Sequence, residues 1–183
     1  MTLNVPPAPT PRGHVPGRRE RAEKWLLKAA KSQEDAVVEW TEQGVALLTA
    51  GREWDVVRAP YTALGPDLER CTDVQGLRRH AEELGGGAVW CDRYRRCLYF
   101  LVPPGTDRGW PQDRRLAGVE CLGGTPPYIH YVGVPRVDRI EPCGFFWLAP
   151  LDSASQVLAD PRRLYEALLA RAGASQPPPP NTP

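Results

Sequence analysis

Residues 44–60, GVALLTAGREWDVVRAP, contain two short apolar runs on either side of a turn signal. The runs are Val45–Leu48 and Trp54–Val57, and a glycine, Gly51, lies between them. Short apolar runs interrupted by glycine predict two strands joined as a β-hairpin. The second run also carries a carboxylate, Asp55, among apolar neighbours. A buried charge needs a partner, a metal ion or exposure at a strand end, so Asp55 is the first candidate site residue.

The distribution of proline sets the domain boundaries that we expect in the 183 residues. The 21 prolines concentrate at the two ends of the chain, where there is little apolar surface to bury. We therefore expect a disordered arm over residues 1–18, one folded domain over residues 19–172 and a disordered Pro-rich tail over residues 173–183. With 42% hydrophobic and 25% charged residues, the middle of the chain can bury an ordinary core.

The spacing of apolar residues predicts both helices and strands in this domain. Ser32 and Asp160 are expected N-caps of two helices. Helices flanking hairpin-connected strands predict an α+β domain with a mostly antiparallel sheet. The expected helices span residues 19–31, 33–41, 66–84 and a stretch from 161 onward; Thr72-Asp73 and Gly76 weaken the third, so a break into two helices is the alternative. The further expected strands span 88–91, 97–102, 118–122, 128–134 and 145–148.

The charge balance gives no general attraction to nucleic acid, because the net charge is only +1. Arginines are nevertheless frequent in the centre of the chain, and clustered arginines can bind phosphate in a nearly neutral protein. Arg93, Arg95 and Arg96 are the candidates for binding a nucleotide or nucleic acid. A set of solvated arginines without a ligand is the alternative interpretation.

The five cysteines have neither the spacing of a disulfide framework nor that of a zinc site, because their number is odd and no CxxC pair occurs. We expect buried, reduced thiols. The N-terminus has no apolar signal region, and no stretch reaches the roughly 20 apolar residues of a membrane helix. The expectation is a soluble, cytoplasmic protein that has no membrane partner.

Three blocks of sequence carry a family resemblance. GVALLTAGREWDVVRAP is similar to a strand pair that ends in an Asp-x-Asp motif, and VWCDRYRRCLYFLVPPGT to a hairpin with a histidine before a Leu-Tyr-Phe-type strand. GVECLGGTPPYIHYVGVP is similar to the strand that bears a third acidic residue. In this order the blocks resemble the bifunctional DNA primase/polymerase (Prim-Pol) domain of the archaeo-eukaryotic primase superfamily, over roughly residues 22–150. The resemblance implies an RRM-like palm sheet.

The resemblance also implies Asp55 and Glu120 as catalytic and metal-ligating residues, but in a degraded motif set. Val57 stands at the second acidic position and Cys97 at the histidine position. A thiol cannot hold a triphosphate as a cation does. Nucleotidyl transfer uses two divalent ions, and two carboxylates can hold at most one weakly bound Mg²⁺ or Mn²⁺. We therefore expect catalysis to be weak or absent.

Each carboxylate has a structural alternative. Asp55 can form an ion pair with Arg52 or Arg58 near the strand end, and Glu120 can simply face solvent, because it alternates with apolar neighbours.

The expected function is a degenerate Prim-Pol-like domain that binds a nucleotide or single-stranded DNA with little or no catalysis. Two alternatives stay open. The first is a protein-interaction module that kept the fold and binds a protein partner. The second is a weak metal-dependent nucleotidyltransferase that uses Asp55 and Glu120. The missing motif residues favour a protein that is not an enzyme.

Overall fold

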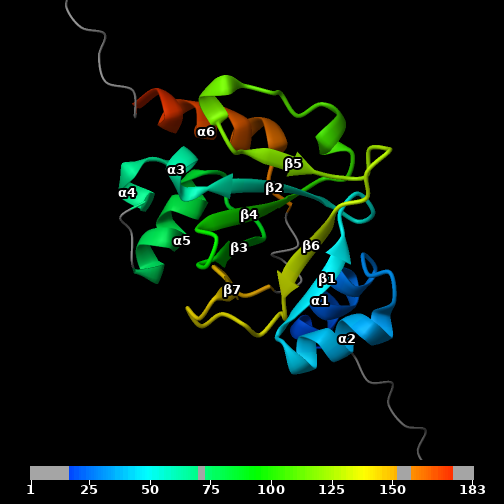
Figure 1. The fold of residues 1–183 in the computed structure, drawn as a ribbon. Coiled ribbons are helices and arrows are strands. Elements are labelled where there is room, and N and C mark those ends of the chain that lie inside the picture. Colours follow the sequence, from blue (N-terminus) through cyan, green and yellow to red (C-terminus); the bar gives the residue numbers. More distant parts are fainter. Residues whose placement is uncertain (1–16, 70–72, 152–157, 175–183) are drawn as a thin grey trace, which may run out of the picture.

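Two N-terminal helices, a strand-rich centre and a C-terminal helix follow one another in the computed structural model, which describes residues 17–69, 73–151 and 158–174 (Figure 1). The α-helices are α1 (Arg18–Leu27), α2 (Gln33–Glu42), α3 (Tyr61–Leu64), α4 (Pro66–Glu69), α5 (Val74–Glu83) and α6 (Pro161–Ala174). The strands are β1 (Val45–Thr49), β2 (Asp55–Pro60), β3 (Val89–Asp92), β4 (Cys97–Val102), β5 (Glu120–Leu122), β6 (Tyr131–Pro135) and β7 (Phe145–Trp147), and the short 3₁₀ helices are η1 (Thr106–Arg108) and η2 (Arg114–Leu116).

Five strands form an antiparallel sheet in the order β5-β2-β4-β3-β7. The chain passes from β2 through α3, α4 and α5 to the β3–β4 hairpin, which places β4 between β2 and β3. Strand β5 then pairs with the other edge of β2. This is the split β-α-β order of an RRM-like sheet, in which η1 and η2 occupy the place of the second helix. The predicted α+β class with a mostly antiparallel sheet is confirmed.

The predicted hairpin of β1 with β2 is wrong. Strand β1 pairs with β6 in a separate two-stranded ribbon, with Leu48 opposite Val132. Strand β2 lies inside the large sheet, between β5 and β4, so both of its edges are occupied. A strand has only two edges, so β1 has none to pair with on β2. The turn at Gly51 joins two sheets and not two neighbouring strands.

Both faces of the large sheet are covered. One face, which we call the ribbon face, packs against α1, α2 and the β1–β6 ribbon (Figure 1). The opposite face, which we call the helix face, packs against α3, α5 and α6 (Figure 1). Neighbours in sequence on β2, Val56 and Val57, are both completely buried and belong to different cores. On the ribbon face Trp90 stacks on Tyr99 with ring centres 5.0 Å apart, and Trp147 meets Trp90 edge-on. Aromatic packing therefore forms the centre of this core.

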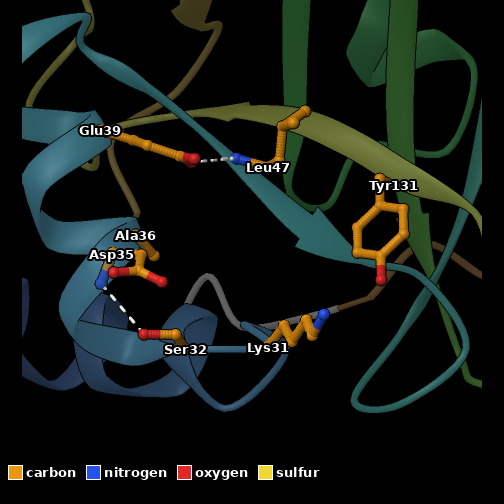
Figure 2. A pocket seen from close by; sticks show the side chains of 7 residues that line it. All are labelled: Lys31, Ser32, Asp35, Ala36, Glu39, Leu47 and Tyr131. Carbon is orange, nitrogen blue, oxygen red and sulfur yellow. Dashed lines mark hydrogen bonds between the residues drawn. The ribbon is translucent and has the colours of Figure 1, made fainter.

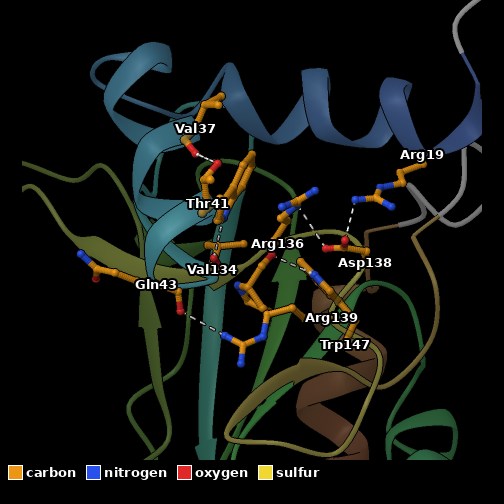
Figure 3. Close-up of polar contacts among 11 residues, drawn as sticks. Arg19, Val37, Thr41, Gln43, Val134, Arg136, Asp138, Arg139 and Trp147 are labelled. Carbon is orange, nitrogen blue, oxygen red and sulfur yellow. Dashed lines mark hydrogen bonds and ion pairs between the residues drawn. The ribbon is translucent and has the colours of Figure 1, made fainter.

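Indole hydrogen bonds join α2, the ribbon and β7 (Figure 3). The Trp40 Nε1–H donates to the carbonyl of Val134, and the Trp147 Nε1–H donates to the carbonyl of Pro135. Arg139 adds a bond to the carbonyl of Gln43 at the end of α2. The ribbon is thus held on two sides by buried donors, so its position relative to the sheet is defined.

Two local predictions about helix starts are confirmed. The Ser32 hydroxyl accepts from the backbone N–H of Asp35, and the Asp160 carboxylate accepts from that of Arg163. Each satisfies a free N–H group in the first helical turn. The β3–β4 hairpin is confirmed as well, and its turn is closed by the Asp92 carboxylate, which accepts from two backbone N–H groups.

Some expected boundaries differ from the structure. The stretch expected as one helix over residues 66–84 forms two, which was the alternative: α4 ends at Glu69, and α5 begins at Val74 after the Asp73 N-cap. Helix α3 lies where a loop was expected. Gly173 was assigned to the tail but lies within α6, where helical geometry continues to Ala174. The expected disorder over residues 1–16 and 175–183 lies outside the described residues.

Candidate functional site

The two predicted metal ligands lie on opposite faces of the sheet. Arg58 is directly opposite Glu120 in the register, so these two side chains share the ribbon face. Asp55 is three residues before Arg58 on β2, and alternation along a strand places it on the helix face. One ion cannot contact carboxylates on both faces. The structure therefore does not bring Asp55 and Glu120 together to hold one shared ion.

Asp55 is buried beside a second carboxylate, Asp107. The Asp55 side chain is 0% exposed, and its Oδ2 accepts from the backbone N–H of Asp107 at 2.9 Å. Burial, together with the nearby charge of Asp107, raises the pKa of Asp55 to about 6. The structure thus gives Asp55 the partner Asp107, whereas an ion pair with Arg52 or Arg58 was expected.

Asp107 connects this buried carboxyl to the loop between β5 and β6. Its Oδ2 accepts from the backbone N–H of Thr125 at 2.8 Å. Partial burial opposes ionisation of Asp107, but the hydrogen bonds from Thr125 outweigh it and lower the pKa of this carboxyl. The sequence reasoning missed Asp107, because it lies in η1, 52 residues after Asp55, and carries no motif.

The three predicted phosphate-binding arginines do not form one cluster. They follow one another in the β3–β4 turn, but only Arg95 lines a cavity on the ribbon face. The Arg96 guanidinium lies over the ring of Tyr61, 5.6 Å from its centre. Arg93 acts electrostatically on the buried thiol of Cys91, which belongs to the helix-face core.

Three cavities meet at Tyr131, and we call their joint surface the Tyr131 groove. One, of about 450 Å³, lies between α2 and the ribbon (Figure 2). A second, of about 410 Å³, lies beside the Gly51 turn, and a third, of about 330 Å³, lies between the ribbon and the large sheet. Tyr131 is 49% exposed, and Leu47 beside it is 57% exposed. The groove thus has an exposed aromatic ring at its centre.

Four cations line the Tyr131 groove, and they come from four separate parts of the chain. Lys31 lies between α1 and α2, Arg52 in the turn after β1, Arg58 on β2 and Arg95 in the β3–β4 turn. In Figure 2 the Lys31 amine and the Tyr131 hydroxyl border the same opening. The acids Asp35 and Glu39 of α2 also line the groove, and Glu120 on β5 pairs with Arg58 at its edge.

The inner wall of the groove combines an ion pair with buried groups that do not ionise near neutral pH. Arg58 donates to Glu120 at 2.8 Å. Burial raises the pKa of the Cys97 thiol and that of the Tyr99 hydroxyl. Cys97 at the predicted histidine position is therefore a neutral, buried thiol, and cationic character comes from Arg58 and Arg95.

The sequence reasoning identified Arg95 but missed most of the groove. Lys31 and Tyr131 are 100 positions apart in the numbering, and no spacing rule connects them. Tyr131 carried only a weak signal, because a tyrosine can stack on a base but aromatic residues in strands mostly pack in cores. The neighbouring His130 bonds through Nδ1 to the carbonyl of Gly123 and so contacts the loop before β6.

The described cysteines are all free, in agreement with the expected reduced state. Cys91 and Cys97 are buried as expected, but Cys143 is exposed, so the expectation of burial is wrong for that residue. Within residues 17–69, 73–151 and 158–174, no group of three or more His, Cys, Asp or Glu side chains is arranged to hold a metal ion. Nor does any helix in these ranges have the length and apolar character needed to cross a membrane.

Comparison with known proteins adds no relative. No family model matches the chain, and neither a curated protein nor a solved structure matches it. The resemblance to Prim-Pol domains therefore stays a prediction, and the function has to be argued from the Tyr131 groove.

Proposed function

We propose that this protein binds single-stranded DNA or a nucleotide in the Tyr131 groove and does not catalyse nucleotidyl transfer. The observation that carries the proposal is the convergence of four cations from four parts of the chain around one exposed tyrosine. Single-stranded nucleic acid is bound by basic grooves that follow the backbone and by aromatic rings on which bases stack. We also propose that the protein is cytoplasmic and that it is a degenerate member of the Prim-Pol family.

In this proposal each part of the groove has its own role. Arg58 and Arg95 line the cavity between the sheet and the ribbon and would contact one phosphate. Lys31 and Arg52 line the cavity on the other side of Tyr131 and would contact another. The ring of Tyr131 lies between these two pairs and would stack on a base.

Binding of a labelled oligothymidine, followed by fluorescence anisotropy, tests the proposal. Replacing Arg58 and Arg95 together by Gln should lower affinity at low salt and reduce the slope of log K against log salt by about 1 for each arginine. Tyr131→Ala should lower affinity by about 1–3 kcal/mol with an unchanged salt slope. Arg79→Gln, an exposed arginine on α5 away from the groove, is the matched control and should bind as wild type. Equal affinities for all four proteins would refute the assignment of this groove.

Glu120→Gln should strengthen DNA binding by up to about fivefold at low salt. Glu120 is half exposed and pairs with Arg58, so it competes with phosphate for that guanidinium. The gain should vanish at high salt, because the Debye length shortens. The same titration, run at two salt concentrations, measures the gain, and weaker binding by Glu120→Gln would contradict the role given to Arg58.

Removal of divalent metal should leave DNA binding and stability unchanged. The two carboxylates expected from the family motif lie on opposite faces of the sheet and cannot share an ion. Anisotropy titrations with EDTA and with Mg²⁺ or Mn²⁺ should coincide at matched ionic strength, and primer extension should give no product. Extension that Asp55→Asn abolishes would instead establish a nucleotidyltransferase.

An interaction with a protein partner is the second candidate function. Tyr128 and Ile129, next to the groove, are 69% and 66% exposed, and large exposed apolar side chains of this kind often mark interfaces. A stoichiometric partner that is retained after nuclease treatment and lost in the double variant Tyr128→Ser/Ile129→Ser would support it.

A further inference from the structure

A second groove, separate from the Tyr131 groove, lies at the start of α6. Its volume is about 360 Å³, and its lining includes Trp110, Pro111, Pro161 and Tyr165. The rings of Trp110 and Tyr165 meet edge-to-face, with centres 5.6 Å apart and planes at 83°. We call it the Trp110 groove.

The lining of the Trp110 groove suits proline better than a charged or reactive ligand. Two aromatic rings and two proline rings form half of its lining, and Arg162 is the charged side chain in it. Grooves lined with Trp and Tyr recognise proline-rich segments in the polyproline II conformation, which enter with little loss of conformational entropy. The chemical class of the occupant is therefore a short proline-rich segment.

The chain itself supplies such a segment immediately after α6. The described residues end at Ala174, and residues 175–183, SQPPPPNTP, follow in the sequence. Four of these nine residues are consecutive prolines. We propose that the C-terminal segment, residues 175–183, docks in the Trp110 groove of its own chain.

The length of the segment matches the distance to the groove. Helix α6 has 14 residues, which at 1.5 Å per residue makes it about 20 Å long. The segment leaves at the end of α6, and the groove lies at its start. If residues 175–176 reverse the chain direction, the remaining seven residues in polyproline II conformation span about 22 Å. The prolines at 177–180 span about 12 Å of this path and end beside Tyr165, and residues 181–183 extend it to Pro161.

A stripe of half-buried apolar side chains on α6 runs from the end of the helix, where the segment leaves, to the Trp110 groove at its start. Tyr165, Leu169 and Ala172 are spaced four and three residues apart, so they lie on one side of the helix. All three remain partly exposed at the edge of the core. Prolines packed along this stripe would remove apolar surface from water at about 25 cal/mol per Å².

Nuclear magnetic resonance of the full chain tests the proposal through two signals. The {¹H}–¹⁵N NOE of the Gln176 and Thr182 amides should report an ordered backbone, and the Trp110 indole N–H resonance should shift when residues 175–183 are deleted. The Trp40 indole, which donates to Val134 on the other side of the molecule, should not move. The double substitution Pro178→Ser/Pro179→Ser, which leaves the described residues unchanged, should release the tail amides and shift Trp110 in the same way as the deletion.

The outcomes are decisive. Mobile tail amides in the wild type, or an unchanged Trp110 resonance after deletion, would overturn the proposal. A Trp110 shift caused by deletion of residues 1–16 in place of 175–183 would assign the groove to the N-terminal segment and also overturn it. A shift that depends on protein concentration would indicate the tail of a second copy and would overturn docking within one chain. The DNA-binding proposal is independent of each result.

Discussion

Asp55→Asn should raise the free energy of unfolding at about pH 8 by roughly 2–3 kcal/mol. The Asp55 carboxyl is fully buried and lies beside the carboxylate of Asp107, and each of the two keeps one oxygen, Oδ1, without a hydrogen-bond partner. An asparagine keeps the acceptor for the Asp107 N–H. Its amide group can also donate to the Asp107 carboxylate, so a buried charge is exchanged for a hydrogen bond.

The pH dependence follows from the direction of the shift. The pKa of Asp55 rises from 3.8 to about 6 on folding, so the folded state holds this proton more tightly than the unfolded state. This contribution to stability is fully present below the unfolded pKa and is lost as the pH rises through about 6. The pKa of Asp107 is lowered, so its contribution is present above its unfolded pKa of 3.8 and is lost as the pH falls through its folded pKa. Wild-type stability should therefore decline between about pH 4 and pH 6.

Urea unfolding followed by tryptophan fluorescence measures both effects. The Asn variant should show a flatter profile over this pH window and should match the wild type near its lower end. Glu166→Gln removes an exposed carboxylate that pairs with Arg162 on α6, and it should change stability by less than about 0.5 kcal/mol at either pH. An Asn variant less stable than the wild type at about pH 8 would show that the Asp55 charge stabilises the fold.

Gly51→Ala should destabilise the protein by about 3 kcal/mol or more and weaken DNA binding. Gly51 has a φ of +92°, a conformation that L side chains rarely adopt. A Cβ atom here would also collide with the backbone of Gly124, which belongs to the loop between β5 and β6. The substitution therefore pushes apart two backbone segments that border the Tyr131 groove at Arg52.

A second glycine separates the two causes. Gly86 has a φ of +64° but has open space where its Cβ would lie. Gly86→Ala should therefore cost only about 1 kcal/mol, from backbone strain alone. Thermal unfolding of both variants gives the loss of stability for each, and the difference between the two losses is the cost of the collision with Gly124. Equal losses for the two variants would mean that the contact between Gly51 and Gly124 is not rigid.

Local features of the fold were predictable because their causes are local. Ser32 and Asp160 cap helices through bonds to residues three positions away, and the β3–β4 hairpin is closed by Asp92 within its own turn. The pairing of β1 was not predictable from its neighbourhood. Its partner β6 is more than 80 positions later, and nothing near β1 indicates that both edges of β2 are already occupied.

For the candidate site too, the sequence predicted the local features and not the contacts between distant residues. The sequence singled out Asp55 correctly as a carboxylate in apolar surroundings, and its burial is confirmed. It did not indicate the neighbour Asp107, nor the strand register that puts Asp55 and Glu120 on different faces. A sequence motif gives only the order of residues along the chain. Whether their side chains lie close enough to bind one ligand depends on how the strands pair.

By itself the sequence determined the α+β class, the helix caps and the central hairpin, because apolar periodicity and short-range hydrogen bonds act over a few residues. The tertiary structure alone decided that β1 leaves the main sheet, that Asp55 lies against Asp107, and that four distant cations surround Tyr131. These arrangements arise because the chain must cover both faces of one twisted sheet with the segments available. That requirement involves the whole chain at once, so it cannot be predicted from any single stretch of sequence.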